Sequence, residues 1–279
     1  MYKTILLHAD ASRSAPERLK LAAMLAAQQQ AHLICAAMTG ISRYVYRQHE
    51  QLPHDVIRPD LAQALTARTQ QMLEEFGHKA ASLGVQSCEQ RLVQDDAYGG
   101  LVLQSRYADL LILGQADRDD PATGALLQDL PEYVVLNTCR PVLLVPSIGN
   151  SSTIGNRVLV GWNGSTQAAR AITQALPLLR NASRVVVGVV DPVIGQDQHG
   201  EEPGADIALY LARHGVNVEV KCQASEGDAG EALLDMTDRI QADLLVMGAY
   251  GHARFREILL GGATRTVLNT MTVPVLLSH

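Results

Sequence analysis

The sequence predicts an α/β protein made of two doubly wound domains, each with a parallel sheet and helices on both faces. The first observation is an internal repeat: Ala-Asp-Leu-Leu-Ile-Leu-Gly at residues 108–114 recurs as Ala-Asp-Leu-Leu-Val-Met-Gly at 242–248. The closing Pro-Val-Leu-Leu run of residues 141–144 recurs at 274–277. The second observation is that short apolar runs alternate with helical segments in each half. A chain of 279 residues is also long enough for two domains of ordinary size.

The second half shows the order of elements most clearly. Apolar, Val-rich runs predict buried strands, Ser165 is a good N-cap for the helix that follows the first strand, and Gly215 is a typical residue at a helix C-terminus. Five strands are expected at residues 158–161, 184–190, 216–220, 244–247 and 273–277. Four helices are expected between them, at residues 168–179, 204–214, 228–241 and 262–271.

The first half follows the same order, beginning with a strand at residues 4–8. It contains an additional polar stretch at 44–59 before a long helical segment at 61–83. His49 and His54 lie in that stretch, and their spacing favours solvated loop histidines over metal ligands. Residues 147–156 are rich in Ser, Gly and Asn and have the composition of a linker. The expected domains are therefore 1–147 and 155–279.

Composition limits the classes of function. The net charge of -6 and pI near 5.8 argue against a broad nucleic-acid or anionic-membrane surface. No apolar run reaches about 18 residues, and no signal-peptide pattern precedes the first strand. Four cysteines without CxxC spacing fit reduced thiols rather than disulfides or zinc. We therefore expect a cytoplasmic protein with no metal site and no membrane or nucleic-acid partner.

A glycine-rich pattern in the second half suggests a phosphate-binding loop. Gly248 and Gly251 follow a predicted strand at the edge where doubly wound sheets bind ligands. Gly261 and Gly262 precede a helix whose N-terminus would favour an anion. Glycines permit positive φ and close backbone approach. The alternative is a tight turn followed by a helix cap, which the spacing alone favours.

The repeat, the D-L-L-x-x-G strand, the G-x2-G-x9-G spacing and the closing P-V-L-L strand resemble the universal stress protein family in its tandem form. The resemblance implies Rossmann-like, adenine nucleotide α-hydrolase-like domains with five-stranded sheets of order 3-2-1-4-5. It also implies a stress-response role with ATP, with or without Mg²⁺, as the ligand. In the ATP-binding branch the motif wraps the phosphates, which carries that role onto Gly248, Gly251 and Gly261.

Other positions depart from the family pattern or are matched less directly. The family has Ser or Thr where this chain has Gly262, and Thr264 offers a hydroxyl two residues on. Asn163 stands where the family has an acid near the ribose, and an amide still hydrogen-bonds without the charge. The resemblance also assigns backbone contacts with adenine to Val189 or Val190.

The first half departs much further from the nucleotide-binding pattern. Asp117 replaces the second glycine, and Asp119, Asp120 and Asp129 add negative charge where phosphates would lie. Asp10 matches the family acid, but it is also a suitable cap for the following helix. We therefore expect one nucleotide site per chain, in the second half.

The sequence contains no recognisable catalytic constellation. It has neither a G-x-S-x-G elbow nor a G-x-x-x-x-G-K-[ST] loop. His252 and Arg254 follow the glycine loop, either facing a γ-phosphate or lying in a polar surface loop. Three functions remain open: a regulatory ATP-binding stress protein, a nucleotide-free interaction module and a slow ATPase. The apolar last strands also predict self-association, by pairing of the two halves and as a homodimer.

Overall fold

A computed structural model describes residues 1–44, 59–123, 126–149, 153–192, 201–225, 227–251 and 262–279. Most of the polar stretch with His49 and His54 lies outside these residues. So do Gly261, His252 and Arg254.

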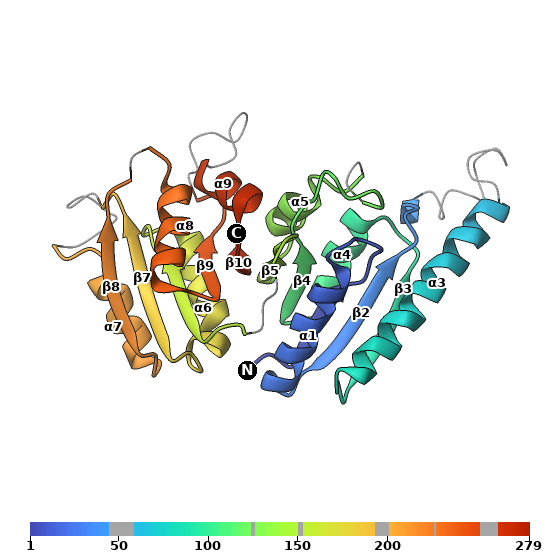
Figure 1. Cartoon of the computed structure of the whole chain (residues 1–279), viewed down its shortest axis with the longest axis horizontal. Helices are drawn as coiled ribbons and strands as arrows, with labels where there is room; N and C mark the ends of the chain where they lie inside the picture. Colours follow the sequence, from blue (N-terminus) through green and yellow to red (C-terminus); the bar gives the residue numbers. More distant parts are fainter. Residues whose placement is uncertain (45–58, 124–125, 150–152, 193–200, 226, 252–261) are drawn as a thin grey trace. The chain divides into compact units, whose positions relative to one another are not determined.

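The first repeat is a doubly wound α/β domain (Figure 1). Its strands follow the order β3-β2-β1-β4-β5, as the family resemblance implied. Helices α1 and α3 pack together on one face of the sheet, and α4 and α5 on the other. The strands are β1 (Thr4–His8), β2 (His32–Met38), β3 (Cys88–Val93), β4 (Leu110–Gly114) and β5 (Val142–Val145); the helices are α1 (Ala15–Gln29), α3 (Pro59–Ser82), α4 (Ala97–Ser105) and α5 (Leu130–Asn137).

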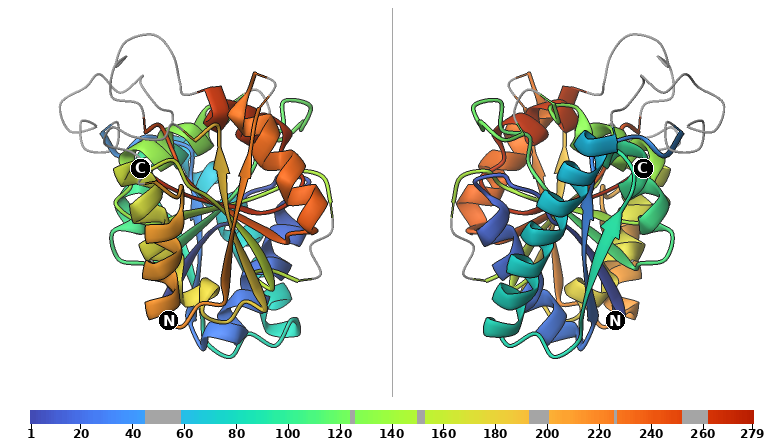
Figure 2. Two further views of the ribbon diagram at one scale, coloured as in Figure 1. Left: turned by 90° about the vertical axis from the view of Figure 1, so that its left-hand side faces the viewer. Right: turned by 90° about the vertical axis from the view of Figure 1, so that its right-hand side faces the viewer.

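The second repeat has the same topology, with strand order β8-β7-β6-β9-β10 and all its own strands parallel. Helices α6 and α7 lie on one face and α8 and α9 on the other (Figure 2). The strands are β6 (Arg157–Gly161), β7 (Arg184–Val190), β8 (Val218–Gln223), β9 (Leu244–Gly248) and β10 (Val275–Ser278); the helices are α6 (Thr166–Leu179), α7 (Ala205–Arg213), α8 (Ala229–Ile240) and α9 (Gly262–Thr270).

Strand β8 begins later than the sequence predicted. Gly215 adopts φ +80°, and the amide of Val216 donates to the Leu211 carbonyl at 3.1 Å. This bond closes the end of α7 and keeps Val216 out of the strand. The alternating pattern therefore starts at Val218.

Two compact units make up the chain, Tyr2–Arg140 and Pro141–His279. Strand β5 belongs to the second unit, where it pairs antiparallel with β10. The register sets Leu143 opposite Leu276, and the residues of both strands are buried. The predicted pairing of the two closing strands is confirmed, and each covers an apolar edge of the other. The homodimer remains a prediction.

The cores follow from the strand sequences. Central strands β1, β4, β6 and β9 are almost entirely buried because helices cover both faces, so apolar side chains can point to either side. The outer strands β3 and β8 alternate in exposure instead. Within the described residues, no helix has the length and apolar character needed to cross a membrane.

Candidate functional site

The second repeat contains a cavity of about 360 Å³ at the carboxyl ends of its strands. It lies where β6 and β9 are neighbours and the strand order reverses, the usual ligand position in a doubly wound sheet. Its size is at the lower end of the range for small-molecule sites. The cavity is lined by Gly161, Trp162, Asn163, Gly188, Val190, Asp191, Ala229, Leu233, Met247, Gly248, Tyr250, Gly251, Gly262, Ala263 and Thr264.

Close contacts, and not positive φ, explain why the predicted phosphate loop has glycine at positions 248 and 251. A Cβ on Gly248 would lie 2.4 Å from the amide nitrogen of Ala168, so the end of β9 passes too close to helix α6 for any side chain. At Gly251 a Cβ would meet the Ser165 Oγ at 3.1 Å. Neither residue has positive φ, which corrects that part of the sequence argument. The close backbone approach that was also predicted is present.

Positive φ falls on Tyr250 instead, at 60°. An aromatic residue rarely adopts this conformation, so its surroundings must hold it there. The Tyr250 amide donates to the Thr264 Oγ1 at 3.3 Å, and the imidazole of His279 lies 3.0 Å from the Ala249 carbonyl. Thr264 is buried and therefore fastens the glycine loop to helix α9.

A carboxylate lies beside the N-terminus of α9, where the sequence predicted a phosphate. Asp228 caps α8, accepting from the Gly230 amide at 2.6 Å, and accepts from the Thr266 hydroxyl at 2.7 Å. These hydrogen bonds, Thr266 first, lower the pKa of Asp228 below its usual value. Its Oδ2 would be 3.8 Å from a Cβ on Gly262. An anion at this helix end therefore has a neighbouring negative charge.

The rim opposite α9 is formed by the ends of β6 and β7. The Oδ1 of Asn163 accepts from the Ser165 hydroxyl at 2.7 Å, so its Nδ2 group is what it offers a ligand. Val190 lines the cavity, whereas Val189 does not and is fully buried. Asp191 follows with φ 46°, and hydrogen bonds from Ser225 lower its pKa.

The structure therefore brings together most of the predicted site residues: Asn163, Gly248, Gly251, Gly262 and Thr264. Sequence reasoning missed Trp162, Asp191 and the apolar wall of Leu233 and Met247. Trp162 carried a usable signal, since it is the only tryptophan and directly follows β6. Among the described residues no group of three His, Cys, Asp or Glu side chains could hold a metal.

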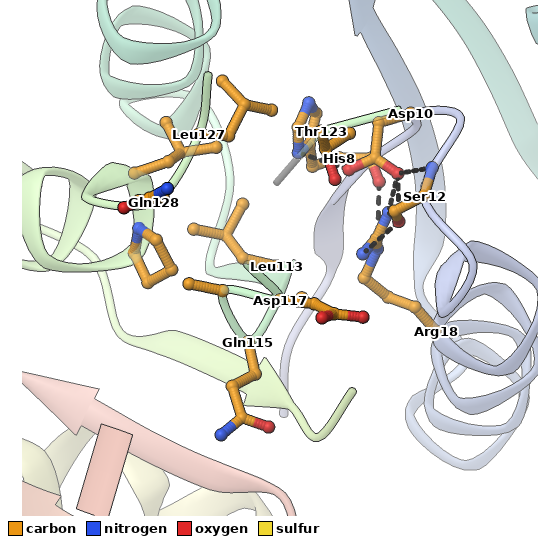
Figure 3. Close-up of a pocket in the computed structure, with 14 residues that line it drawn as sticks. His8, Asp10, Ser12, Arg18, Leu113, Gln115, Asp117, Thr123, Leu127 and Gln128 are labelled. Atoms are coloured by element: carbon orange, nitrogen blue, oxygen red, sulfur yellow. Dashed lines mark hydrogen bonds and ion pairs between the residues drawn. The ribbon is translucent and has the colours of Figure 1, made fainter. Parts of the chain in front are cut away.

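The matching place in the first repeat is filled by its own side chains (Figure 3). The remaining cavity is only about 30 Å³, room for about one or two waters. His8 ends β1 as Gly161 ends β6, and the imidazole of His8 is buried. Ten residues on in each repeat, Arg18 corresponds to Ala171; both are buried, but only Arg18 fills space with a charged side chain. The space that remains is less than a tenth of the cavity in the second repeat.

A buried ion pair holds this filling in place. The Arg18 Nη2 donates to the Asp10 Oδ1 at 2.7 Å, and its Nε donates to the His8 carbonyl at 3.2 Å. Burial alone would raise the pKa of Asp10, but Arg18, His8 and Ser12 outweigh it and lower that pKa. Burial lowers the pKa of His8 to about 4. A Cβ on Gly114 would lie 2.3 Å from the Arg18 Nη1, so this glycine makes room for the guanidinium.

Two acidic residues of the first repeat, Asp117 and Asp120, hold the loop after β1 through Arg13. Asp120 is buried and accepts from the Arg13 amide at 2.7 Å and the Ala122 amide at 2.7 Å. Asp117 pairs with the Arg13 guanidinium at 3.0 Å. These contacts offset part of the negative charge that the sequence argument invoked. Occupied space, rather than repulsion alone, closes this pocket.

The fold and the switch-point cavity define an α/β protein with two doubly wound domains. The sequence profile of the universal stress protein family matches residues 1–146 and again 155–279. The chain therefore belongs to the universal stress protein family, as a tandem of two such domains.

Individual relatives agree with this assignment. A universal stress protein of Synechocystis sp. is 27% identical over 173 residues, which is 60% of this chain. The match spans 57% of that relative's length. A universal stress protein structure from Archaeoglobus fulgidus DSM 4304 matches 99% of this chain and 95% of its own, with 17% identity and a TM-score of 0.72.

Two further solved structures match at lower similarity. A functionally unknown protein from Pseudomonas aeruginosa PAO1 matches 99% of this chain and 92% of its own, with 16% identity and a TM-score of 0.58. A universal stress protein in complex with cAMP matches 53% of this chain and 98% of its own, with 23% identity and a TM-score of 0.37.

Proposed function

We propose that the second repeat binds one adenine nucleotide, ATP or a close relative, and that its occupancy regulates a stress-response role of the protein. The observation that carries the proposal is the difference between the two switch-point cavities, about 360 Å³ in the second repeat and about 30 Å³ in the first. Only the larger one has room for a base and ribose.

The lining of the larger cavity has two chemically different ends. Trp162, Leu233 and Met247 supply apolar and aromatic surface that suits a flat base. Gly251 and the first turn of α9 supply backbone N–H groups suited to phosphate oxygens. A nucleotide lying from β7 towards α9 would place its base against this apolar surface and its phosphates at these N–H groups.

Asp228 sets a condition on the phosphate end. Its carboxylate beside α9 repels a bare triphosphate, whereas a Mg²⁺ ion bound to the phosphates offsets part of that charge. We therefore expect MgATP to bind more tightly than ATP in EDTA. The Asp228→Asn variant should reduce that difference.

The direct test is equilibrium binding of ATP, ADP, AMP and cAMP to the full chain, by calorimetry and by the fluorescence of Trp162. We expect one site per chain. Gly251→Asp places a carboxylate at the cavity, where the Ser165 and Gln167 side chains can move aside, and should weaken binding at least tenfold. The matched change in the other repeat, Asp117→Gly, should leave both stoichiometry and affinity unchanged.

Other outcomes select between the alternatives. Absence of binding by any adenine nucleotide would favour a nucleotide-free interaction module. Phosphate release that disappears in Gly251→Asp would instead identify a slow ATPase. Two equivalent sites per chain would contradict the proposal outright.

A further inference from the structure

The first repeat contains a pair of cysteines that the candidate site does not use. The Sγ of Cys35 lies 3.9 Å from the Sγ of Cys88. Cys35 is in β2 and Cys88 is the first residue of β3, the outermost strand of this repeat. The register sets Cys88 beside Leu33, so the two cysteines are diagonal neighbours on the same face of the sheet.

The two thiols have unequal environments. Cys35 is fully buried, whereas Cys88 is exposed. The hydrogen bond between the two thiols lowers the pKa of Cys88, against the opposing effects of partial burial and the Glu89 carboxylate. The same hydrogen bond and its burial raise the pKa of Cys35. Cys88 therefore ionises first, and it is also the thiol that a solute can reach.

We propose that Cys88 and Cys35 form a peroxide-responsive dithiol, with Cys88 as the attacking thiol and Cys35 as the resolving one. The Cys88 thiolate attacks a hydroperoxide oxygen, forming a sulfenic acid and releasing hydroxide or alkoxide, which takes up a proton. The Cys35 sulfur then attacks the Cys88 sulfur. The disulfide forms, and the departing hydroxyl leaves as water with the proton of Cys35. A dithiol reductant reverses the change.

Closing this bond requires a local movement. The two sulfur atoms must approach from 3.9 Å to about 2.05 Å. In parallel strands about 4.8 Å apart with a rise of about 3.3 Å per residue, diagonal neighbours lie about 8 Å apart at Cα, beyond the usual disulfide span of about 4.4–6.8 Å. Cys88 can supply the shift because it starts an outer strand after the turn at Gly84. A disulfide closed against that resistance should be easily reduced, as a reversible modification needs.

The experiment treats the full chain with hydrogen peroxide, blocks remaining thiols and maps peptides by mass spectrometry without reduction. We expect a Cys35–Cys88 cross-link that dithiothreitol removes. Cys222 is the internal control, since it is an exposed thiol on β8, the corresponding outer strand of the second repeat. Cys88 should be consumed at least tenfold faster than Cys222.

Two variants separate the roles. In Cys35→Ser, Cys88 should accumulate as a sulfenic acid that dimedone labels. In Cys88→Ser, which alters only an exposed position, Cys35 should stay reduced under the same treatment. The proposal is overturned if Cys88 in the native chain proceeds to sulfinic acid without a cross-link, or if it reacts no faster than Cys222.

Discussion

The switch-point pockets of the two repeats share a backbone plan but differ in what fills them. In the first, His8 and Arg18 occupy the space, and Asp10 neutralises the guanidinium at 2.7 Å. In the second, Gly161 lines a cavity of about 360 Å³, and Ala171 stands at the position of Arg18. Both retain the same short turn, in which Asp10 accepts from Ser12 and Asn163 from Ser165. The size of the switch-point cavity in each repeat therefore depends on a few side chains at strand ends and on the first helix, rather than on topology.

The largest expected effect comes from breaking the filled pocket. Arg18→Met leaves the Asp10 carboxylate poorly solvated and without its cation, and should lower the free energy of unfolding by about 3–5 kcal/mol. Adding Asp10→Asn, which copies Asn163, should recover much of the loss. Urea unfolding measures both. Arg239→Ala, at an exposed ion pair, is the control and should change stability by less than about 1 kcal/mol. A similarly small loss in Arg18→Met would show that the pocket filling is not structural.

A smaller effect is expected from the pH dependence of His8. Its pKa falls from 6.5 when unfolded to about 4 when folded, so the unfolded chain binds the proton more readily. The resulting stability is fully present above pH 6.5 and is lost as the pH falls towards 4, by roughly 2 kcal/mol at pH 5. His8→Gln should flatten the stability profile between pH 7 and 5. Parallel profiles for the two proteins would contradict a buried neutral imidazole.

The smallest of these effects tests the open pocket. Gly161→His copies His8 into the second repeat, where the new Cβ meets the flexible Leu233 side chain at 3.2 Å. Nucleotide affinity should fall about tenfold, equivalent to about 1.4 kcal/mol. Lys221→His adds the same side chain at an exposed position on β8 and should bind normally. Unchanged affinity in Gly161→His would place the ligand elsewhere.

The sequence predicted the topology because parallel strands buried on both faces appear as apolar runs. The internal repeat shows the same order of runs twice. The sequence located the glycine loop but not the reason for each glycine, since the contact of Gly248 with Ala168 joins positions 80 residues apart. The burial of Arg18 could not be predicted from the sequence, because an arginine on a helix is ordinarily solvated. Only the folded chain brings Arg18 against Asp10 and Gly114. Of the two residues proposed for a backbone contact with adenine, Val190 lines the cavity and Val189 does not.

The β5–β10 ladder also has a consequence for how the protein responds to dilution. Two separate single-domain chains joining through such strands would obey mass action and come apart at low concentration. Here both strands belong to one polypeptide, so their encounter is intramolecular, with an effective concentration set by the intervening chain. Covalent fusion thus makes the pairing independent of expression level. It also allows the two halves to diverge, because neither must remain able to pair with a copy of itself.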